Sequence, residues 1–410
     1  MSSKIEVVPP ENVGLSAERL ARIETHLRGR YIDPRKIAGC LTLVARKGEV
    51  AYLSALGSMD LERDKPMSED TIFRIYSMTK PITSVALMML YEHGHFQLDD
   101  AVHKYIPEWR DLRVYQTGNH PRWLTTPCER PMTIRDLFCH MSGLTYGFME
   151  RTNVDRAYRR LGVGREDSKD LRAMIEALAG LPLEFSPGTR WNYSVSTDVL
   201  GYLVEVFSGM PLDEYFRTKI FEPLGMNDTG FNVPADKLDR FAANYTRGRR
   251  KELRIEDDPG ASRYAEPATF FSGGGGLVST AADYLRFCRM LLNRGELDGH
   301  RLLGRKTIEL MTSNHLPEGR DLTELATGAF SETTYEGVGF GLGFSVQLDC
   351  AKSQIVGTPG EFAWGGAAST AFWIDPSEEL ITIFMTQLMP SGTFNFRGQL
   401  KSIIYPAIVD

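Results

Sequence analysis

The chain has 410 residues, of which 42% are hydrophobic and 24% are charged, a composition typical of a globular protein with one large or two moderate domains. Its net charge of −6 argues against a nucleic-acid-binding protein. Residues 1–14 lack the apolar core of a secretory signal, and no apolar run approaches the roughly 20 residues that span a bilayer. The sequence therefore predicts a cytoplasmic protein that binds neither nucleic acid nor membrane.

The cysteines and histidines form no disulfide framework or metal motif. Five scattered cysteines contain no C-x-x-C pair, and the eight histidines contain no H-E-x-x-H. His93 and His95 lie near a predicted helix end and are interpreted as solvated, whereas His140 is interpreted as structural. We therefore predict no metal and no organic cofactor.

The N-terminal part predicts a helix, a hairpin and a second helix. Residues 15–29 have helical periodicity, with Ser16 as a candidate N-cap. Residues 38–57 predict two strands joined by a tight turn. Residues 71–75 are β-prone, and an amphipathic helix follows them and ends at Gly94.

A serine and a lysine stand at the start of this second helix. Ser77 and Lys80 are three residues apart and share one helical face, and Pro81 is tolerated only near a helix start. A neutral lysine can take the serine proton, and the free N–H groups of a helix N-terminus suit a developing oxyanion. The alternative is a surface serine and a surface lysine on an ordinary helix, because S-x-x-K alone is a weak motif.

Residues 96–270 predict a mainly helical inserted domain. The expected helices, each ending at or next to a glycine, are 131–144, 168–180 and 196–209. Irregular loops are expected at 112–130 and 146–168. The glycine-rich stretch 270–280 ends the insertion, and we interpret it as a close-packed loop because the lysine of a phosphate-binding loop is missing.

The C-terminal part predicts strands between two helices. The expected helices are 281–295 and 399–409, and the strand-rich segments are 337–348, 360–375 and 379–388. Strands at both chain ends predict an α+β fold: one antiparallel sheet, built from residues 1–95 and 271–410 and flanked by helices, with 96–270 inserted. The helix that carries Ser77 would lie where the two domains meet, a common position for ligand clefts.

Two further elements complete a candidate site. Tyr193 precedes a predicted helix, and its phenolic oxygen could relay a proton between Ser77 and Lys80, although it could equally be an ordinary capping tyrosine. The run Trp364-Gly365-Gly366 lies in a predicted strand, where glycines let a ligand approach the backbone. The Ala367 N–H could then join that of Ser77 in an oxyanion hole, and the alternative is a β-bulge.

Together these elements resemble the penicillin-recognising serine hydrolases, in particular class C β-lactamases and family VIII carboxylesterases. Those proteins carry S-x-x-K, then Y-x-N or a Y-x-x variant, then K-T-G or W-G-G, in this order. Here the three motifs are Ser77-Met78-Thr79-Lys80, Tyr193-Ser194-Val195 and Trp364-Gly365-Gly366. With similar flanks at 137–144, 221–226, 270–287 and 362–376, the resemblance covers roughly residues 10–405. It implies a serine β-lactamase-like fold.

The resemblance also implies roles for these residues. Ser77 would be the nucleophile, Lys80 and Tyr193 would move its proton, and Trp364-Gly365-Gly366 would contact the substrate. Val195 replaces the asparagine of Y-x-N, and Trp364 replaces the lysine of K-T-G that suits a substrate carboxylate. Both changes favour small, neutral, short-chain carboxylic esters, which would be cleaved through an acyl-enzyme on Ser77.

Other functions remain open. Relatives that acylate statin precursors share the serine, lysine and tyrosine, so acyl transfer to an alcohol fits the motifs, as does weak β-lactamase or DD-peptidase activity. A non-catalytic scaffold on this fold is disfavoured because Ser77 and Lys80 are both present. The sequence does not distinguish Lys80 from Tyr193 as the base, and it predicts no oligomeric state.

Overall fold

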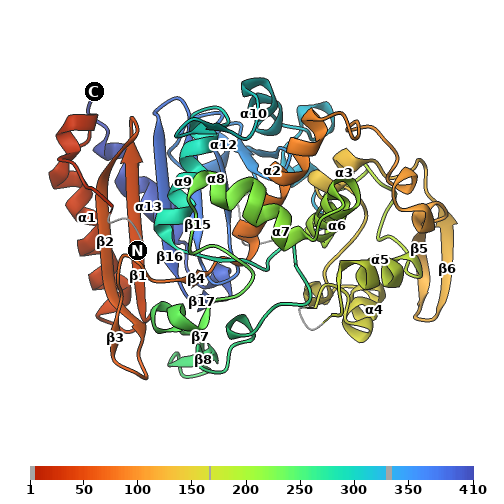
Figure 1. Ribbon diagram of the computed structural model, residues 1–410, viewed down its shortest axis with the longest axis horizontal. Coiled ribbons are helices and arrows are strands. Elements are labelled where there is room, and N and C mark those ends of the chain that lie inside the picture. The colour runs from red at the N-terminus through yellow and green to blue at the C-terminus, as the bar shows by residue number, and fades with distance from the viewer. Residues whose placement is uncertain (1–4, 166–167, 329–334) are drawn as a thin grey trace.

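The computed structural model describes residues 5–165, 168–328 and 335–410. Among these residues, eight strands form one antiparallel sheet in the order β12-β13-β14-β15-β16-β1-β2-β3 (Figure 1). The strands are β1 (Gly39–Arg46), β2 (Glu49–Asp60), β3 (Lys65–Pro66), β12 (Val338–Phe340), β13 (Ser345–Gln347), β14 (Phe362–Gly365), β15 (Ala371–Asp375) and β16 (Leu380–Thr386). Because β1 pairs with β16, the two ends of the chain meet in the middle of the sheet. The predicted α+β fold with a sheet built from both chain ends is confirmed.

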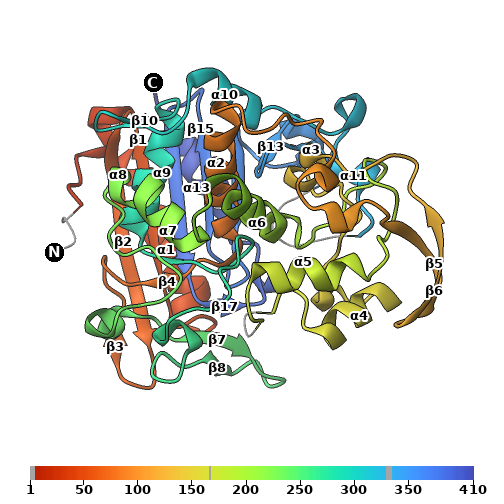
Figure 2. The same cartoon turned by 45° about the vertical axis from the view of Figure 1, so that its right-hand side comes forward.

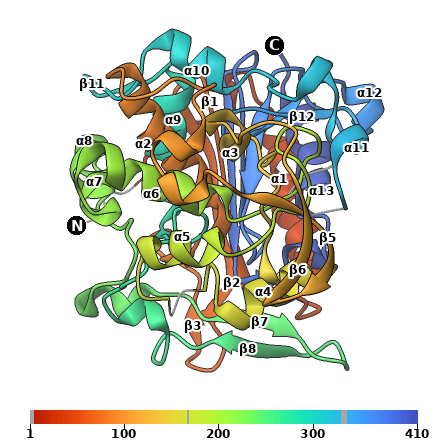
Figure 3. The ribbon, with the colours of Figure 1, turned by 90° about the vertical axis from the view of Figure 1, so that its right-hand side faces the viewer.

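Helices cover both faces of this sheet. Figure 3 views it edge-on, with α1 (Ala17–Leu27) and α13 (Phe396–Ile404) on one side and α2 (Thr79–Glu92) and α9 (Ala281–Leu292) on the other. Helices α1 and α13 contact each other, and α9 contacts β15 and β16. Ser16 caps α1 as predicted, because its side chain accepts a hydrogen bond from the Arg19 N–H.

The helix that follows Ser77 is more deeply buried than its sequence indicated. Every residue of α2 from Thr79 to Met88 is buried, so this part of the helix has no solvated face. The helix is therefore not amphipathic, contrary to the prediction. It packs against α6 (Ser196–Ser208), which comes from the inserted segment. Helix α2 is therefore a central element that contacts both parts of the chain.

The first half of the inserted segment is only partly as predicted. Its helices are α3 (Ile134–Phe138), α4 (Asn153–Leu161), α5 (Leu171–Ala179) and α6. Helix α3 ends at Phe138 rather than at Gly143. The irregular loop expected at 112–130 is instead a hairpin of β5 (Arg113–Asn119) and β6 (Arg122–Pro127), which projects at the right of Figure 1. The loop expected at 146–168 contains α4, and positions 166 and 167 lie outside the described residues.

The sequence of the β5–β6 hairpin does not predict strands, and the reason is physical. None of its strand residues is fully buried, so the sequence lacks the alternation of apolar and polar residues that marks a half-buried strand.

The second half of the inserted segment lies beside the sheet (Figure 2). Its elements are α7 (Leu212–Phe216), α8 (Glu222–Leu224), β7 (Asn244–Arg247) and β8 (Leu253–Asp257). Helix α8 contacts α9, and β7 pairs with β17 (Leu388–Met389) near the C-terminus. The division into 1–95 with 271–410 and 96–270 stays a prediction.

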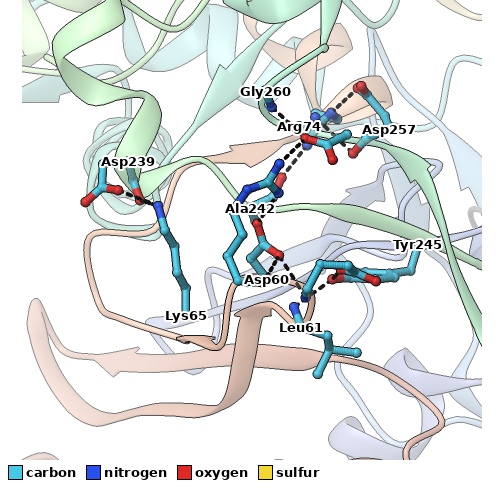
Figure 4. Close-up of polar contacts among 12 residues, drawn as sticks. Asp60, Leu61, Lys65, Arg74, Asp239, Ala242, Tyr245, Asp257 and Gly260 are labelled. Atoms are coloured by element: carbon cyan, nitrogen blue, oxygen red, sulfur yellow. Dashed lines mark hydrogen bonds and ion pairs between the residues drawn. The ribbon is translucent and has the colours of Figure 1, made fainter.

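A buried arginine fastens this second half to the strand that leads to Ser77. Arg74, in β4 (Phe73–Arg74), is fully buried. Its Nε donates to Asp257 Oδ2 at 2.5 Å, and its Nη1 donates to the Ala242 carbonyl at 2.6 Å (Figure 4). A charge without solvent needs such partners, and here they come from a segment about 170 positions further along the chain.

Removing Arg74 should therefore destabilise the protein strongly. In Arg74→Ala, the Asp257 carboxylate and the Ala242 carbonyl lose their donor, and we expect the free energy of unfolding to fall by about 3 kcal/mol or more. Urea unfolding measures this. The control is Arg22→Ala, which removes an exposed ion pair of 3.6 Å with Glu18 and should cost about 0.5 kcal/mol or less. Equal losses in the two variants would contradict the role of Arg74.

Candidate active site

Ser77 lies in a tight turn with a strained backbone. The turn is a short 3-10 segment, Tyr76–Met78, directly before α2. Tyr76 has a φ of +40°, a left-handed conformation that is uncommon and strained for a residue with a side chain. The preceding Ile75 N–H donates to the Leu277 carbonyl at 3.1 Å, which fixes the backbone before the turn. The fold thus maintains a strained backbone immediately before Ser77.

The structure brings the three predicted catalytic side chains together. The Tyr193 hydroxyl donates a hydrogen bond of 2.6 Å to Ser77 Oγ, and Lys80 Nζ donates to the same oxygen at 3.3 Å. Lys80 Nζ also lies 4.5 Å from the centre of the Tyr193 ring. The exposed fractions are 9% for Ser77, 2% for Lys80 and 1% for Tyr193, so solvent competes little with these contacts.

A cavity of about 720 Å³ opens at Ser77 and Tyr193. Ser77, Tyr193 and Ala367 line it. Much of the remaining wall is apolar and comprises Tyr146, Phe148, Val163, Met389 and Pro390. Such a cavity, largely apolar with a few convergent polar groups, is typical of small-molecule sites.

The glycines after β14 let its backbone approach the nucleophile turn. A side chain at Gly366 would place its Cβ 2.3 Å from the Ile75 carbonyl oxygen, closer than any such contact in proteins. Only glycine therefore fits between this strand and the turn. The next residue, Ala367, lines the same cavity as Ser77, although its role in an oxyanion hole stays a prediction.

The Trp364 side chain is buried among aromatic rings. Its side chain is 1% exposed, and its ring centre lies 5.6 Å from that of Tyr193 and 5.3 Å from that of Phe340. Among the described residues, the cavity wall includes neither Trp364 nor the glycines Gly365 and Gly366. The indole thus packs on the Tyr193 ring, and contact of Trp364, Gly365 and Gly366 with a substrate stays a prediction.

Two residues at the cavity were not predicted as site residues from the sequence. Tyr146 lies with its ring centre 5.2 Å from that of Tyr193 and 5.4 Å from Lys80 Nζ. Asp198 is 2% exposed and lies in the first turn of α6. An acidic residue in a first turn is ordinary helix chemistry, and Tyr146 fell in a stretch interpreted as a loop, so neither carried a distinguishing signal.

His140 lies beside the site but is suited to a structural role. Burial, together with the positive charge of Lys80, holds the pKa of His140 well below its usual value, so its ring is neutral. Its Nδ1 lies 3.2 Å from Ser194 Oγ, and its ring centre lies 4.9 Å from that of Tyr193. The contacts favour the interpretation of His140 as a packing residue.

The described parts of the chain contain neither a metal-binding cluster nor a membrane-spanning helix. No group of three or more histidine, cysteine, aspartate or glutamate side chains there is arranged to hold a metal ion. None of the described helices has the length and apolar character needed to cross a bilayer.

Comparison with known proteins identifies the family. The family model described as Beta-lactamase matches residues 20–401. The chain belongs to the beta-lactamase family. This confirms the family predicted from the serine–lysine, tyrosine and tryptophan–glycine motifs.

Individual members are similar over nearly their whole length. Protein Rv1367c of Mycobacterium tuberculosis is 37% identical over 361 residues, 87% of this chain and 88% of that protein. Esterase EstB of Burkholderia gladioli is 33% identical over 408 residues, 93% of this chain and 94% of EstB. The solved structure of EstCE1, described as a hydrolase with promiscuous acyltransferase activity, has a TM-score of 0.79 at 28% identity and covers 95% of this chain and 99% of its own.

The buried position of Trp364 generates a prediction for this member of the beta-lactamase family. Trp364→Lys would place a cation beside the Tyr193 ring, away from the cavity, so we expect kcat/KM to fall by about 10- to 100-fold for neutral and anionic substrates alike. The measurement compares an aryl acetate with a chromogenic cephalosporin. The control is Trp364→Phe, which keeps an aromatic contact and should lose less activity. A selective gain on the cephalosporin would show that this side chain faces the substrate after all.

Proposed function

We propose that this protein is a carboxylesterase that cleaves short-chain carboxylic esters through an acyl-enzyme on Ser77. The observation that carries the proposal is the 2.6 Å hydrogen bond between Tyr193 and Ser77 Oγ, with Lys80 Nζ 3.3 Å from the same oxygen, at the wall of an apolar cavity. A serine hydroxyl beside two such groups is suited to nucleophilic attack once the pair has lost a proton and can take that of the serine. Similarity to a protein named as an esterase, EstB, supports the assignment.

Acylation would begin with attack of Ser77 Oγ on the ester carbonyl carbon. Its proton passes to the Lys80–Tyr193 pair as the new C–O bond forms. The resulting oxyanion is stabilised by the backbone N–H groups of Ser77 and Ala367, which lie at the same cavity. The C–O bond to the alcohol then breaks, and the alcohol leaves with the proton that the pair had taken.

Deacylation would use the same groups in reverse. A water molecule gives its proton to the Lys80–Tyr193 pair and attacks the carbonyl carbon of the acyl-enzyme. The bond to Ser77 Oγ breaks, Ser77 regains a proton from the pair, and the carboxylic acid is released. Because Lys80 Nζ lies 4.5 Å from the centre of the Tyr193 ring, we assign the transferred proton to the pair and not to either side chain.

Charge in the cavity favours neutral esters. The lysine of K-T-G is absent, and the charged residues in the cavity wall have both signs: Glu150 and Asp198 are acidic, and Arg159 and Arg165 are basic. No single charge therefore dominates, and the apolar side chains provide most of the surface for binding. This arrangement supports a neutral ester better than a carboxylate-bearing β-lactam.

Acyl transfer to an alcohol is a second candidate, favoured by the size of the cavity. About 720 Å³ exceeds what a short acyl group and a water molecule occupy, so an acceptor alcohol has room beside the acyl-enzyme. EstCE1, at 28% identity, is described as having promiscuous acyltransferase activity. Adding an alcohol to the ester reaction and measuring the ratio of new ester to free acid distinguishes transfer from hydrolysis.

The first test concerns the nucleophile. Wild-type protein should release a burst of aryl alcohol from a short-chain aryl ester, and Ser77→Ala should release none because the covalent step is lost. Circular dichroism and thermal unfolding verify that the variant is folded. If Ser77→Ala retains more than about a tenth of the wild-type kcat, Ser77 is not the nucleophile.

The second test asks whether Lys80 and Tyr193 act as one unit. Lys80→Ala and Tyr193→Phe should each lower kcat by about 10²-fold or more, because each removes a partner of Ser77 Oγ. The double variant should lose far less than the product of the two losses. Steady-state kinetics on all four proteins measure the coupling, and fully multiplicative losses would mean that the two side chains act independently.

A further inference from the structure

Asp198 is a buried carboxylate at the cavity that the proposed reaction does not use. Its Oδ1 accepts two hydrogen bonds, one of 2.5 Å from Ser272 Oγ and one of 3.0 Å from the Gly274 N–H. Both groups act as donors here, and 2.5 Å is the length typical of a hydroxyl bound to an ionised carboxylate. The contacts are therefore those of a carboxylate that carries its negative charge.

Gly274 connects this carboxylate to Lys80. Its N–H donates to Asp198, while its carbonyl oxygen accepts a hydrogen bond of 2.6 Å from Lys80 Nζ. A Cβ at Gly274 would lie 2.5 Å from Asp198 Oδ2 and 2.9 Å from the Tyr146 hydroxyl, so both oxygens approach this residue closely. One glycine thus lies between a carboxylate and the amine that contacts the nucleophile.

The charges of Asp198 and Lys80 influence each other. Burial raises the pKa of the Asp198 carboxyl above its usual value, and the Ser272 hydrogen bond and the positive charge of Lys80 offset only part of that rise. Because the interaction is mutual, the negative carboxylate favours the protonated amine. It does so in a site where 2% exposure leaves little water to screen the charges.

The other groups near Asp198 and Lys80 are either neutral or carry charges of opposite sign. Burial, with the negative charge of Asp198, holds the pKa of Tyr146 well above its usual value, so this tyrosine keeps its proton. His140, near Lys80, is neutral. Tyr193 is the partner of Lys80, and Glu150, Arg159 and Arg165 line the cavity with opposite signs.

We propose that Asp198 is a positioning residue that acts through Lys80. Its carboxylate holds the Gly274 carbonyl against the amine. The Lys80–Tyr193 pair must lose one proton before it can accept the proton of Ser77, and the carboxylate sets the pH at which that loss occurs. This inference rests on the proposed function, because it takes Ser77 as the nucleophile. It assigns Asp198 no contact with the reacting atoms.

The test is the pH dependence of kcat/KM in Asp198→Asn. The amide keeps the size of the side chain and an oxygen that accepts from Gly274, but it removes the negative charge. Without that charge the pair loses its proton more easily, so the midpoint of the acid limb should shift down by about one pH unit. Asp198→Glu, which keeps the charge, should have a midpoint close to that of the wild type.

A purely structural role gives a different result. It would lower the plateau of kcat/KM in Asp198→Asn and leave the midpoint in place, and that outcome, or a shift to higher pH, overturns the proposal. Thermal unfolding verifies that each variant is folded. If the asparagine variant does not fold, Asp198→Ser, which also lacks the charge, carries the same test.

Asp283 offers a matched control. It is the third residue of α9, as Asp198 is of α6, and it is also buried and accepts hydrogen bonds, of 2.7 Å from the Asp228 N–H and 2.8 Å from Thr229 Oγ1. The wall of the cavity at Ser77 does not include it among the described residues. Asp283→Asn should therefore leave the midpoint unchanged, and an equal shift in this variant would also overturn the proposal.

A second readout separates this inference from the proposed function. A fluorophosphonate reports activation of Ser77 without an ester: the Ser77 Oγ–P bond forms, the P–F bond breaks, fluoride leaves, and the serine proton passes through the pair to solvent. Suppose that the wild type cleaves no ester, but that the pH midpoint of the labelling rate is lower in Asp198→Asn than in the wild type. The proposed function then fails and the role of Asp198 stands. If the wild type cleaves esters and both pH profiles coincide in Asp198→Asn, the role of Asp198 fails alone.

Discussion

Burial of the Lys80 amine is the constraint on which the arrangement of the site depends. An amine that is 2% exposed has lost its water, and its removal from solvent is costly unless other groups replace that water. The replacements are the Gly274 carbonyl, Ser77 Oγ and the faces of the Tyr193 and Tyr146 rings. These groups come from four places in the sequence, so the surroundings of the amine exist only in the folded chain.

The position of helix α2 explains how these groups meet. The helix is buried on all sides, with α6 of the inserted segment against it. Lys80 is in its first turn and donates to the Gly274 carbonyl. A Cβ at Gly274 would lie 2.5 Å from Asp198 Oδ2, and one at Gly366 would lie 2.3 Å from the carbonyl oxygen of Ile75 before the turn. Arg74 fixes the strand on the other side of the turn. The site is therefore rigid because its backbone is packed at glycines and fixed by a buried charge.

Part of this arrangement could be predicted from the sequence, and there are physical reasons why the rest could not. A separation of three residues places Ser77 and Lys80 on one face of any helix, whatever the fold. The contact with Tyr193 spans 116 positions, and only the order of the motifs pointed to it. Alternation along β14 shows that Phe362 and Trp364 share a face, but which neighbours occupy that face depends on the packing of the whole sheet. Asp198 could not be distinguished from an ordinary first-turn acid, because its function depends on a loop 76 positions away.

The buried Trp364 changes how the loss of the K-T-G lysine is understood. A lysine at that position would offer a charge to the substrate, whereas the indole packs against the Tyr193 ring. The replacement therefore changes the surroundings of Tyr193, which donates a hydrogen bond to Ser77 Oγ, and substrate recognition can also draw on other parts of the cavity. There, the Phe148 ring is 60% exposed and stacks on Tyr146 with a centre-to-centre distance of 4.6 Å and an interplanar angle of 19°. An exposed aromatic surface at a cavity is suited to contact with an apolar ligand. Selectivity for neutral esters would then arise from this aromatic wall together with the missing cation, two features supplied by different segments of the chain.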